Sequence, residues 1–236
     1  MEIISGIQIR DLALYLLREK TLVMADLHIG FEEALNKQGI LIPRVHFTEM
    51  MKRIEKFCKG LKIERIIING DLKDEFGKIS DTEWRNVLRF LDFYKGKEII
   101  IVQGNHDTTL APIAEKRGIK LAEYYILGDI LFCHGDKIVL MDAKVKTIII
   151  GHEHPAISLT QGGRTEKYKC FLNGKFKWKN LIVMPSLNPV QEGSDVLQQR
   201  MLSPYLQGNL DQFEVYVVGD EILRFGTVEK IRKEFK

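Results

Sequence analysis

A chain of 236 residues with 28% charged and 45% apolar residues has the composition of an ordinary globular protein, and it is long enough to bury a substantial core. Its formal net charge of +3 is too small to indicate nucleic-acid binding by itself. Three widely spaced cysteines without a CxxC pair argue against a disulfide framework and favour a reducing, cytoplasmic compartment. No signal peptide and no apolar run of about 20 residues is present, so we expect no membrane span.

The first half of the chain alternates strand-like and helical patterns. Apolar runs at 13–17 and 21–25 predict strands, and apolar residues at three- and four-residue spacing predict a helix over about 44–59. A strand at 66–68, a helix over 81–94 with Ser80 or Asp81 as its N-cap, and a strand at 98–102 follow. This alternation argues for βαβ units in a sheet covered by helices.

The second half is rich in strand patterns and poor in helical ones. The predicted strands lie near 119–127, 130–133, 147–150, 167–172, 175–181 and 213–218. Two packed sheets, the first with helices on its outer face, fit this pattern. Because no repeat, linker or boundary signal occurs, we expect residues 1–236 to form a single domain.

A lysine-rich hairpin is predicted over residues 167–179. Asn173-Gly174 is a strong signal for a two-residue turn, and lysines alternate with apolar residues on both sides of it. The basic face of this hairpin either protects an edge strand from aggregation or contacts a phosphate backbone.

Five polar clusters follow predicted strands, and each one closely succeeds an apolar run. They are Asp26-Leu27-His28, Gly70-Asp71, Gly104-Asn105-His106-Asp107, His134-Gly135-Asp136 and Gly151-His152-Glu153-His154. Taken singly they are ambiguous, because Asp26 and His28 could share one face of a strand and hold a metal, or could be a surface aspartate and a core histidine. Taken in order they predict a site for two divalent ions where strands end.

This ordered series resembles the calcineurin-like metallophosphoesterase superfamily over roughly residues 22–154. The resemblance implies an α/β fold, a four-layer αββα sandwich of two mixed β-sheets flanked by helices. It implies that Asp26, His28 and His154 bind a first metal ion and that Asp71 bridges both ions. It further implies that a second ion is bound by three residues: Asn105, His134 and His152.

The remaining cluster residues are expected to serve the chemistry. By resemblance, His106 stays unligated and faces the leaving group, and Asp107 orients its ring. Two ions about 3.5–4 Å apart can clamp the attacking and leaving oxygens of a phosphoryl displacement, with a metal-bridging hydroxide as nucleophile. A histidine titrating near neutral pH is a natural proton donor to the leaving oxygen. The mixed oxygen and nitrogen ligands suit Mn²⁺, which we favour by resemblance, as well as Fe²⁺, Zn²⁺, Co²⁺ or Ni²⁺.

Departures from the motifs narrow the family. Asp74 stands where purple acid phosphatases carry an iron-ligating tyrosine, and Glu75-Phe76 stand where protein phosphatases show Arg-Gly. Asp26-Leu27-His28-Ile29-Gly30 and the segment 184–195 instead resemble the small SbcD-related phosphoesterase branch. This branch implies a phosphodiesterase, with DNA or RNA as a candidate substrate.

Alternatives remain open on the sequence alone. A phosphomonoesterase or nucleotide pyrophosphatase would carry the same ligand motifs, and a metal-binding interaction scaffold with this fold is the non-enzyme alternative. His46 is expected to be structural or exposed, Ser186 and Asn188 to line the rim, and residues 194–212 to form a functional or disordered loop. The natural substrate, the native metal and the oligomeric state stay undetermined.

Overall fold

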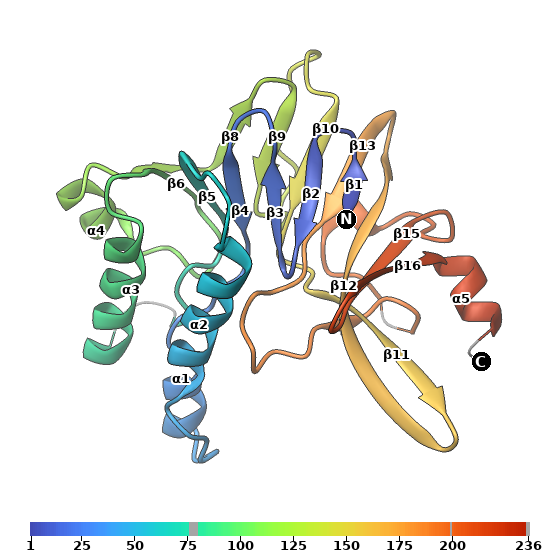
Figure 1. The fold of residues 1–236 in the computed structure, drawn as a ribbon, viewed down its shortest axis with the longest axis horizontal. Coiled ribbons are helices and arrows are strands. Elements are labelled where there is room, and N and C mark those ends of the chain that lie inside the picture. The colour runs from blue at the N-terminus through green and yellow to red at the C-terminus, as the bar shows by residue number, and fades with distance from the viewer. Residues whose placement is uncertain (76–79, 199, 235–236) are drawn as a thin grey trace.

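The computed structural model describes residues 1–75, 80–198 and 200–234, which form two β-sheets with helices at their periphery (Figure 1). Within these residues the first sheet has seven strands in sequence order. They are β1 (Glu2–Ile4), β2 (Ile7–Arg10), β3 (Ala13–Leu16), β4 (Thr21–Met24), β5 (Arg65–Asn69), β6 (Glu98–Val102) and β7 (Lys120–Ala122). β1 to β4 are antiparallel, whereas β4 to β7 are parallel, so the carboxyl ends of the parallel strands share one edge.

Helices pack against this first sheet, as the alternating sequence pattern predicts. They are α1 (Phe31–Lys37), α2 (His46–Cys58), α3 (Asp81–Phe93) and α4 (Ala111–Lys116). α2 buries Met50 and Ile54 in the same core as the sheet, and α3 begins where the Ser80 hydroxyl accepts the Glu83 N–H. The predicted helices at 44–59 and 81–94 and the predicted strand at 98–102 are confirmed, whereas α1 and α4 lack a strong periodic signal.

The second sheet is mixed and contains nine strands among the described residues. They are β8 (Tyr124–Leu127), β9 (Ile130–Cys133), β10 (Thr147–Ile150), β11 (Pro155–Gln161), β12 (Arg164–Phe176), β13 (Lys179–Val183), β14 (Ser194–Asp195), β15 (Glu214–Val218) and β16 (Ile222–Thr227). β9, β10 and β13 are mutually parallel, so this sheet also gathers strand exits at one edge.

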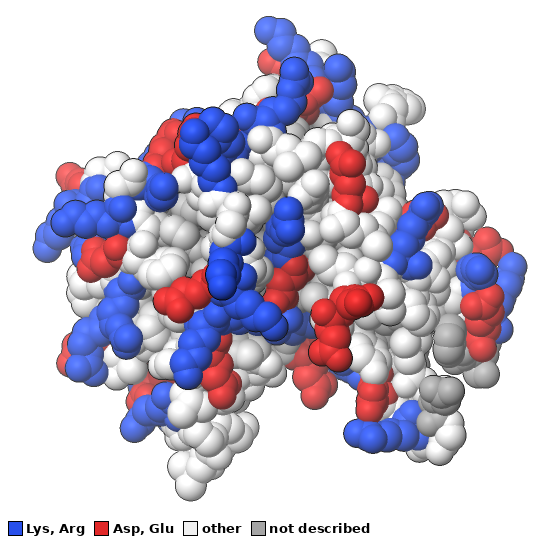
Figure 2. Space-filling view, in the orientation of Figure 1, with Lys and Arg blue, Asp and Glu red and all other residues white. Residues whose placement is uncertain are grey.

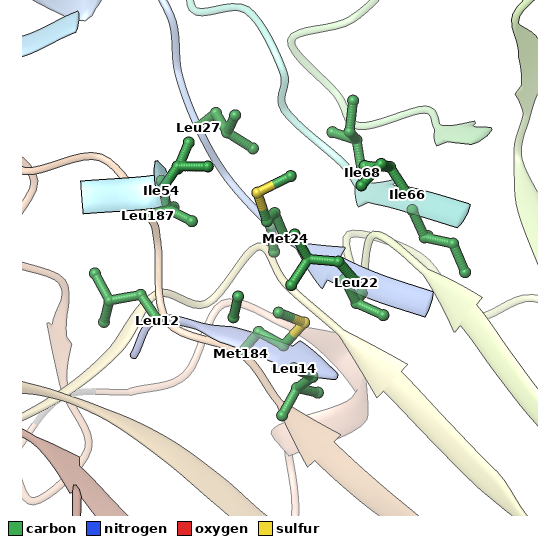
Figure 3. Close-up of a cluster of buried hydrophobic side chains, with 14 of the residues drawn as sticks. Leu12, Leu14, Leu22, Met24, Leu27, Ile54, Ile66, Ile68, Met184 and Leu187 are labelled. Atoms are coloured by element: carbon green, nitrogen blue, oxygen red, sulfur yellow. The ribbon is translucent and has the colours of Figure 1, made fainter. Parts of the chain in front are cut away.

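Alternate residues of the second sheet face two different hydrophobic cores. Ile149 and Ile182 join the core shared with the first sheet, whereas Ile148, Ile150 and Leu181 join a second core. Figure 3 shows part of the shared core, with Met184 and Leu187, which follow β13, among side chains of β3, β4, β5 and α2. Burial on both faces explains the continuous apolar runs of these strands. The predicted double-sheet sandwich is therefore confirmed.

The outer face of the second sheet is covered by the C-terminal part of the chain. Residues Val196, Tyr205 and Leu206, the last two in the short 3₁₀ helix η1 (Pro204–Leu206), are buried in the second core with Ile231 of α5 (Val228–Glu234). The alternative that residues 194–212 form a disordered loop is therefore wrong for the described residues of this segment. Its apolar side chains are spaced irregularly, so no helix or strand period reveals that it packs.

The predicted turn at Asn173-Gly174 is also wrong. Both residues lie inside β12, and the two-residue turn that joins β12 to β13 is Lys177-Trp178, with Lys177 at a φ of 53°. A Cβ atom on Gly174 would lie 2.5 Å from the Phe213 ring, so the glycine allows close packing between strands rather than a turn.

The lysines of the predicted basic hairpin face differ in exposure, since Lys167, Lys175 and Lys177 are exposed and Lys169 and Lys179 are not. Lys169 is largely buried, the Lys167 ammonium lies 3.5 Å from Glu192, and Lys175 donates to the Asn180 side chain at 2.6 Å. β12 is hydrogen-bonded to β11 over 164–169 and to β13 over 172–176, so it is not an edge strand. On the molecular face in Figure 2, lysines and arginines are interspersed with acidic residues. β12 therefore needs no protection as an edge strand, and contact of the hairpin with a phosphate backbone stays a prediction.

None of the helices in the described part of the chain combines the length and apolar character that crossing a membrane requires.

Candidate metal centre

The five polar clusters meet at one place between the two sheets. They follow β4, β5 and β6 in the first sheet and β9 and β10 in the second. The Asn69 side chain at the end of β5 donates to the Ile149 carbonyl of β10 at 3.1 Å, and the Gly151 N–H donates to the His134 carbonyl at 2.8 Å. These contacts fix the strand exits of both sheets against each other, so residues more than 120 positions apart converge.

The backbone at these exits adopts a rare conformation. Eight non-glycine residues have positive φ among those described, and five of them are predicted metal ligands. These are Asp26 (53°), His28 (43°), Asp71 (46°), His152 (64°) and His154 (49°). Left-handed conformations cost about 1–3 kcal/mol each for such residues and persist where surrounding contacts enforce them. Asp26 and His28 therefore converge through a strained loop after β4, not through the predicted shared face of a strand.

A first group of ligand atoms comes from Asp26, His28 and His154. One potential ligand atom of each lies within 4.8 Å of the others. The two histidine Nε2 atoms are 3.4 Å apart, and His154 Nε2 is 3.5 Å from Asp26 Oδ1. These are the three residues that the sequence resemblance assigns to the first ion, and that assignment stays a prediction.

A second group surrounds His134. Its Nε2 lies 2.8 Å from Asn105 Oδ1 and 3.1 Å from His152 Nδ1. Asp71 Oδ2 is 3.3 Å from His134 Nε2 and 3.6 Å from His28 Nε2, so a single carboxylate oxygen reaches both groups. The structure thus brings all seven predicted ligand residues together, with Asp71 between the two sets.

The donor set fits divalent metal ions. Ring nitrogens face each other at 3.1 and 3.4 Å, and carboxylate oxygens lie close by. Electron-pair donors this close repel unless a proton or a cation lies between them, and nitrogen and oxygen donors suit a borderline divalent ion. Two glycines allow the carboxylates to approach the backbone closely. A Cβ on Gly104 would lie 2.1 Å from Asp71 Oδ1, and one on Gly151 would lie 2.5 Å from Asp26 Oδ2.

The electrostatics of the centre also favour positive charge. Burial opposes ionisation of Asp71, but the hydrogen bond and charge of His134 outweigh it and hold the Asp71 pKa well below its usual range. Burial lowers the His134 pKa, but the Asp71 and Asp26 carboxylates outweigh burial and raise it to about 9. Burial, followed by the charge of His134, lowers the pKa of His152. The Asp71 and Asp26 carboxylates therefore stabilise positive charge at this point, as a bound divalent ion would supply it.

His106 lies beside the two groups of ligand atoms. Its backbone N–H donates to Asp71 Oδ1 at 2.9 Å, and its ring Nε2 is 4.0 Å from Asp71 Oδ2. Its ring Nδ1 is 2.5 Å from the Asp74 carbonyl oxygen, which accepts the Nδ1 proton. The side chain is 20% exposed and lines the cavity over the centre.

The predicted role of Asp107 as the residue that orients this ring differs from the structure. Its carboxylate accepts N–H groups from Gly104 at 3.0 Å and from Leu72 and Lys73 at 3.3 Å. Burial, followed by the charge of Asp71, raises the Asp107 pKa to about 6. Asp107 therefore holds together the loops after β5 and β6, and the Asp74 carbonyl contacts the His106 ring in its place.

Sequence reasoning missed Asp74 as a site residue. Its Oδ1 lies 3.0 Å from His28 Nδ1, which leaves His28 Nε2 directed at the first group. Glu83 fixes Asp74 in turn, because its Oε1 accepts the N–H groups of Asp74 and Glu75 at 2.8 and 2.9 Å. The motif Gly-Asp-x-x-Asp contains this signal, but spacing alone does not indicate which histidine the second aspartate contacts.

A cavity of about 850 Å³ opens over the centre. Besides the ligand residues it is lined by Phe31 and Lys37 of α1, by Gln191 and by Leu202. Leu202 is 69% exposed, yet its backbone is held, because buried Glu153 accepts the N–H groups of Leu202 and Ser203 at 2.8 Å each. Glu153, which lies between His152 and His154 in the sequence, thus fixes the backbone of Leu202 in the cavity wall.

Three further predictions concern residues outside the clusters. Ser186 and Asn188 do not line the rim, because both are buried and hydrogen-bond the backbone of the loop at 26–28. His46 opens α2 with its Nδ1 3.5 Å from Glu49, as expected of a residue with a structural role. Phe76, one of the departures noted in the sequence, lies outside the described residues.

Comparisons with known proteins identify the family. A family model described as calcineurin-like phosphoesterase matches residues 19–178. A nuclease MPE from Pseudomonas putida is 18% identical, with coverage of 91% of this chain and 92% of that one and a TM-score of 0.64, which shows a shared fold. Yfce, a phosphoesterase from E. coli, is 14% identical, with coverage of 86% and 96% and a TM-score of 0.41. No curated protein matches the sequence.

The family model covers more than half of the chain, and the matched residues include all five clusters that meet between the sheets. The chain belongs to the calcineurin-like phosphoesterase family.

Proposed function

We propose that the chain is a dinuclear-metal-dependent phosphodiesterase that acts on nucleic acid. The observation that carries the proposal is the convergence of seven ligand residues beside His106, with Asp71 Oδ2 within 3.6 Å of both His28 and His134. In this proposal Asp26, His28 and His154 hold one ion, and Asn105, His134 and His152 hold the other. Asp71 offsets the mutual repulsion of the two ions.

Two divalent ions, Mn²⁺ being the one we favour, supply Lewis acidity to the phosphoryl group and a nucleophile at neutral pH when bound. The protein supplies their orientation. The Asp74 carboxylate fixes His28, since a partner on the far ring nitrogen sets the tautomer and raises ligand basicity. The His152 N–H donates to both oxygens of Asp26 at 3.2 and 3.0 Å, which fixes that carboxylate as well.

We assign His106 as the proton donor to the leaving oxygen. Donation of its Nδ1 proton to the Asp74 carbonyl leaves Nε2 as the exchanging position. As the bond between phosphorus and the leaving oxygen breaks, Nε2 gives that oxygen its proton. The neutral ring that remains keeps its hydrogen bond to Asp74, so the tautomer needs no rearrangement.

The charge of the cavity favours a diester over a monoester. Among the described residues that line it, Lys37 is the one lysine or arginine, and its ammonium pairs with Glu75. A monoester dianion gains from additional cationic groups, whereas a diester carries a single negative charge. Nucleic acid as the diester is supported by the fold shared with the Pseudomonas putida nuclease.

A metal-dependent substrate screen tests this proposal. Chelated protein is reloaded with Mn²⁺ and assayed on single- and double-stranded DNA, RNA, cyclic nucleotides, nucleoside monophosphates and bis-p-nitrophenyl phosphate. We expect turnover of diesters, nucleic acid included, to exceed turnover of the monoesters. Faster release of inorganic phosphate from monoesters would replace the diesterase with a phosphomonoesterase, and no metal-dependent turnover would favour an interaction scaffold.

A further inference from the structure

The strained loop that carries Asp26 and His28 is hydrogen-bonded to two different segments of the chain. On one side the N–H groups of Asp26 and His28 donate to the carbonyls of Gly70 and Asp71 at 3.1 and 2.9 Å. On the other side lie residues 186–188. They come shortly after β13 and are about 160 residues away from the loop along the chain.

Residues 186–188 contact the loop through four hydrogen bonds. The Ser186 hydroxyl donates to the Asp26 carbonyl at 2.7 Å, and the Leu187 N–H donates to the Ala25 carbonyl at 3.1 Å. The Asn188 amide donates to the carbonyls of Leu27 and His28 at 3.1 Å each. Ser186 and Asn188 are 0% and 4% exposed, so water cannot readily replace these bonds.

A lysine holds this segment from behind. The Lys169 ammonium donates to the Ser186 carbonyl at 2.8 Å and also to the Asn188 carbonyl. Lys169 therefore hydrogen-bonds to Ser186 and Asn188, the two residues whose side chains hydrogen-bond to the loop. On the same strand, the Lys167 ammonium donates instead to the Gly193 carbonyl at 3.3 Å and lies 3.5 Å from Glu192.

Burial of Lys169 disfavours the charged form of its side chain. Burial, followed by the charge of Arg53, lowers the Lys169 pKa to about 7. The Ser186 and Asn188 carbonyls nevertheless both accept from the Lys169 Nζ, so this side chain supplies a donor to each of them.

We infer that Lys169 is a positioning residue for the first metal group, acting through Ser186 and Asn188 on the loop at 26–28. The inference rests on the proposed function, because it assumes that Asp26, His28 and His154 bind an ion. It assigns to Lys169 a larger effect on the ion held by Asp26, His28 and His154 than on the other ion, which Asp26 reaches only through its contacts with His152 and His134. The Lys169 contacts lead to the Asp26 loop, whereas Asn105 and His134 are carried by the exits of β6 and β9.

The test compares Lys169→Met with Lys167→Met, a matched variant on the same strand. Mn²⁺ binding to the full chain is measured by isothermal titration, with thermal unfolding of the metal-free proteins alongside. For Lys169→Met we expect one of two binding events to weaken by roughly tenfold or more, as for other partners of ligand residues, with a clearly smaller change in the second event. Lys167→Met is expected to match the wild type.

Two Mn²⁺ events of wild-type affinity in folded Lys169→Met would overturn the inference, and so would equal weakening of both events. If Lys169→Met does not fold, the Ser186→Ala variant tests the inference instead. It removes only the hydroxyl that donates to the Asp26 carbonyl. Ser186→Ala is expected to weaken the same event, and an unchanged titration would overturn the inference. Failure of the wild type to bind two ions would instead contradict the proposed function.

Discussion

Asp74 contacts His106 through its backbone carbonyl, with the oxygen 2.5 Å from the ring Nδ1. The carboxylate of the same residue lies 3.0 Å from Nδ1 of His28. One residue thus sets the tautomer of the proposed proton donor and of a proposed metal ligand, by two chemically different groups. A side-chain substitution can remove one of these contacts and keep the other.

Asp74→Ala should weaken metal binding and leave proton donation intact. It removes the carboxylate on His28 but retains the carbonyl that accepts from His106. We expect Mn²⁺ affinity to fall about 10- to 100-fold. At saturating Mn²⁺ the pH profile of kcat should match the wild type. Asp81→Ala, in the exposed first turn of α3, is the control. Unchanged Mn²⁺ affinity in Asp74→Ala would refute the role of the carboxylate.

His106→Asn should lower turnover with metal still bound. Loss of a general acid costs about 10²- to 10⁴-fold, and the loss is greater for a poor leaving group. We therefore expect a larger fall in kcat on a dinucleotide, which releases an alkoxide, than on bis-p-nitrophenyl phosphate. His46→Asn serves as the control. Equal falls on both substrates, with Mn²⁺ bound, would argue against proton donation by His106.

Leu202→Ser should raise KM and leave kcat nearly unchanged. Leu202 projects from a fixed backbone at the mouth of the cavity, so it can cover an apolar part of the substrate. Partial burial of a leucine side chain contributes about 1 kcal/mol, which corresponds to a KM change of about fivefold. Leu140→Ser, at a leucine that is 95% exposed and does not line this cavity, is the control. A fall in kcat with constant KM would contradict this assignment.

Stability should rise with pH because of Lys169. Its pKa is lowered from 10.5 to about 7, so between these values the unfolded chain binds more protons than the folded one. Stability therefore increases with pH across this window, on the order of 1 kcal/mol per pH unit. The charged groups acting on Lys169 are Arg53, which lowers its pKa, and Asp26 and Asp11, which raise it.

Urea unfolding at pH 7.5 and 9.5 measures this effect. The free energy of unfolding of the wild type should increase over this interval relative to that of Lys169→Met, which lacks the titrating group. Parallel pH dependences in the two proteins would show that the Lys169 pKa is ordinary.

Much of the site was predictable from the sequence, because parallel strands place their carboxyl ends at one edge. Apolar runs locate those ends, and the polar residues that follow, such as Asp71 after β5, must lie near one another. The contacts made by each side chain were not predictable. Asp107 follows His106 directly, yet its carboxylate accepts backbone N–H groups of two loops, and Asp74, 32 residues away in the chain, holds the ring.

Packing between distant segments limited the fold prediction in the same way. Asn173-Gly174 has the local chemistry of a turn, but Phe213 packs where a Gly174 side chain would project, and the strand continues. The free energy gained by burying an aromatic ring exceeds the small local preference of two residues for a turn. Likewise Lys169 belongs by sequence to an alternating basic face, and only the fold places Ser186 and Asn188 against it.

The central claim is that this centre needs two ions to hydrolyse a phosphodiester. Metal-free protein should be titrated with Mn²⁺ while binding and hydrolysis of bis-p-nitrophenyl phosphate are followed together. Activity should be absent without metal, reach its maximum at two equivalents of Mn²⁺ and disappear on chelation. Full activity in the metal-free protein, or maximal activity at a single equivalent, would contradict this claim.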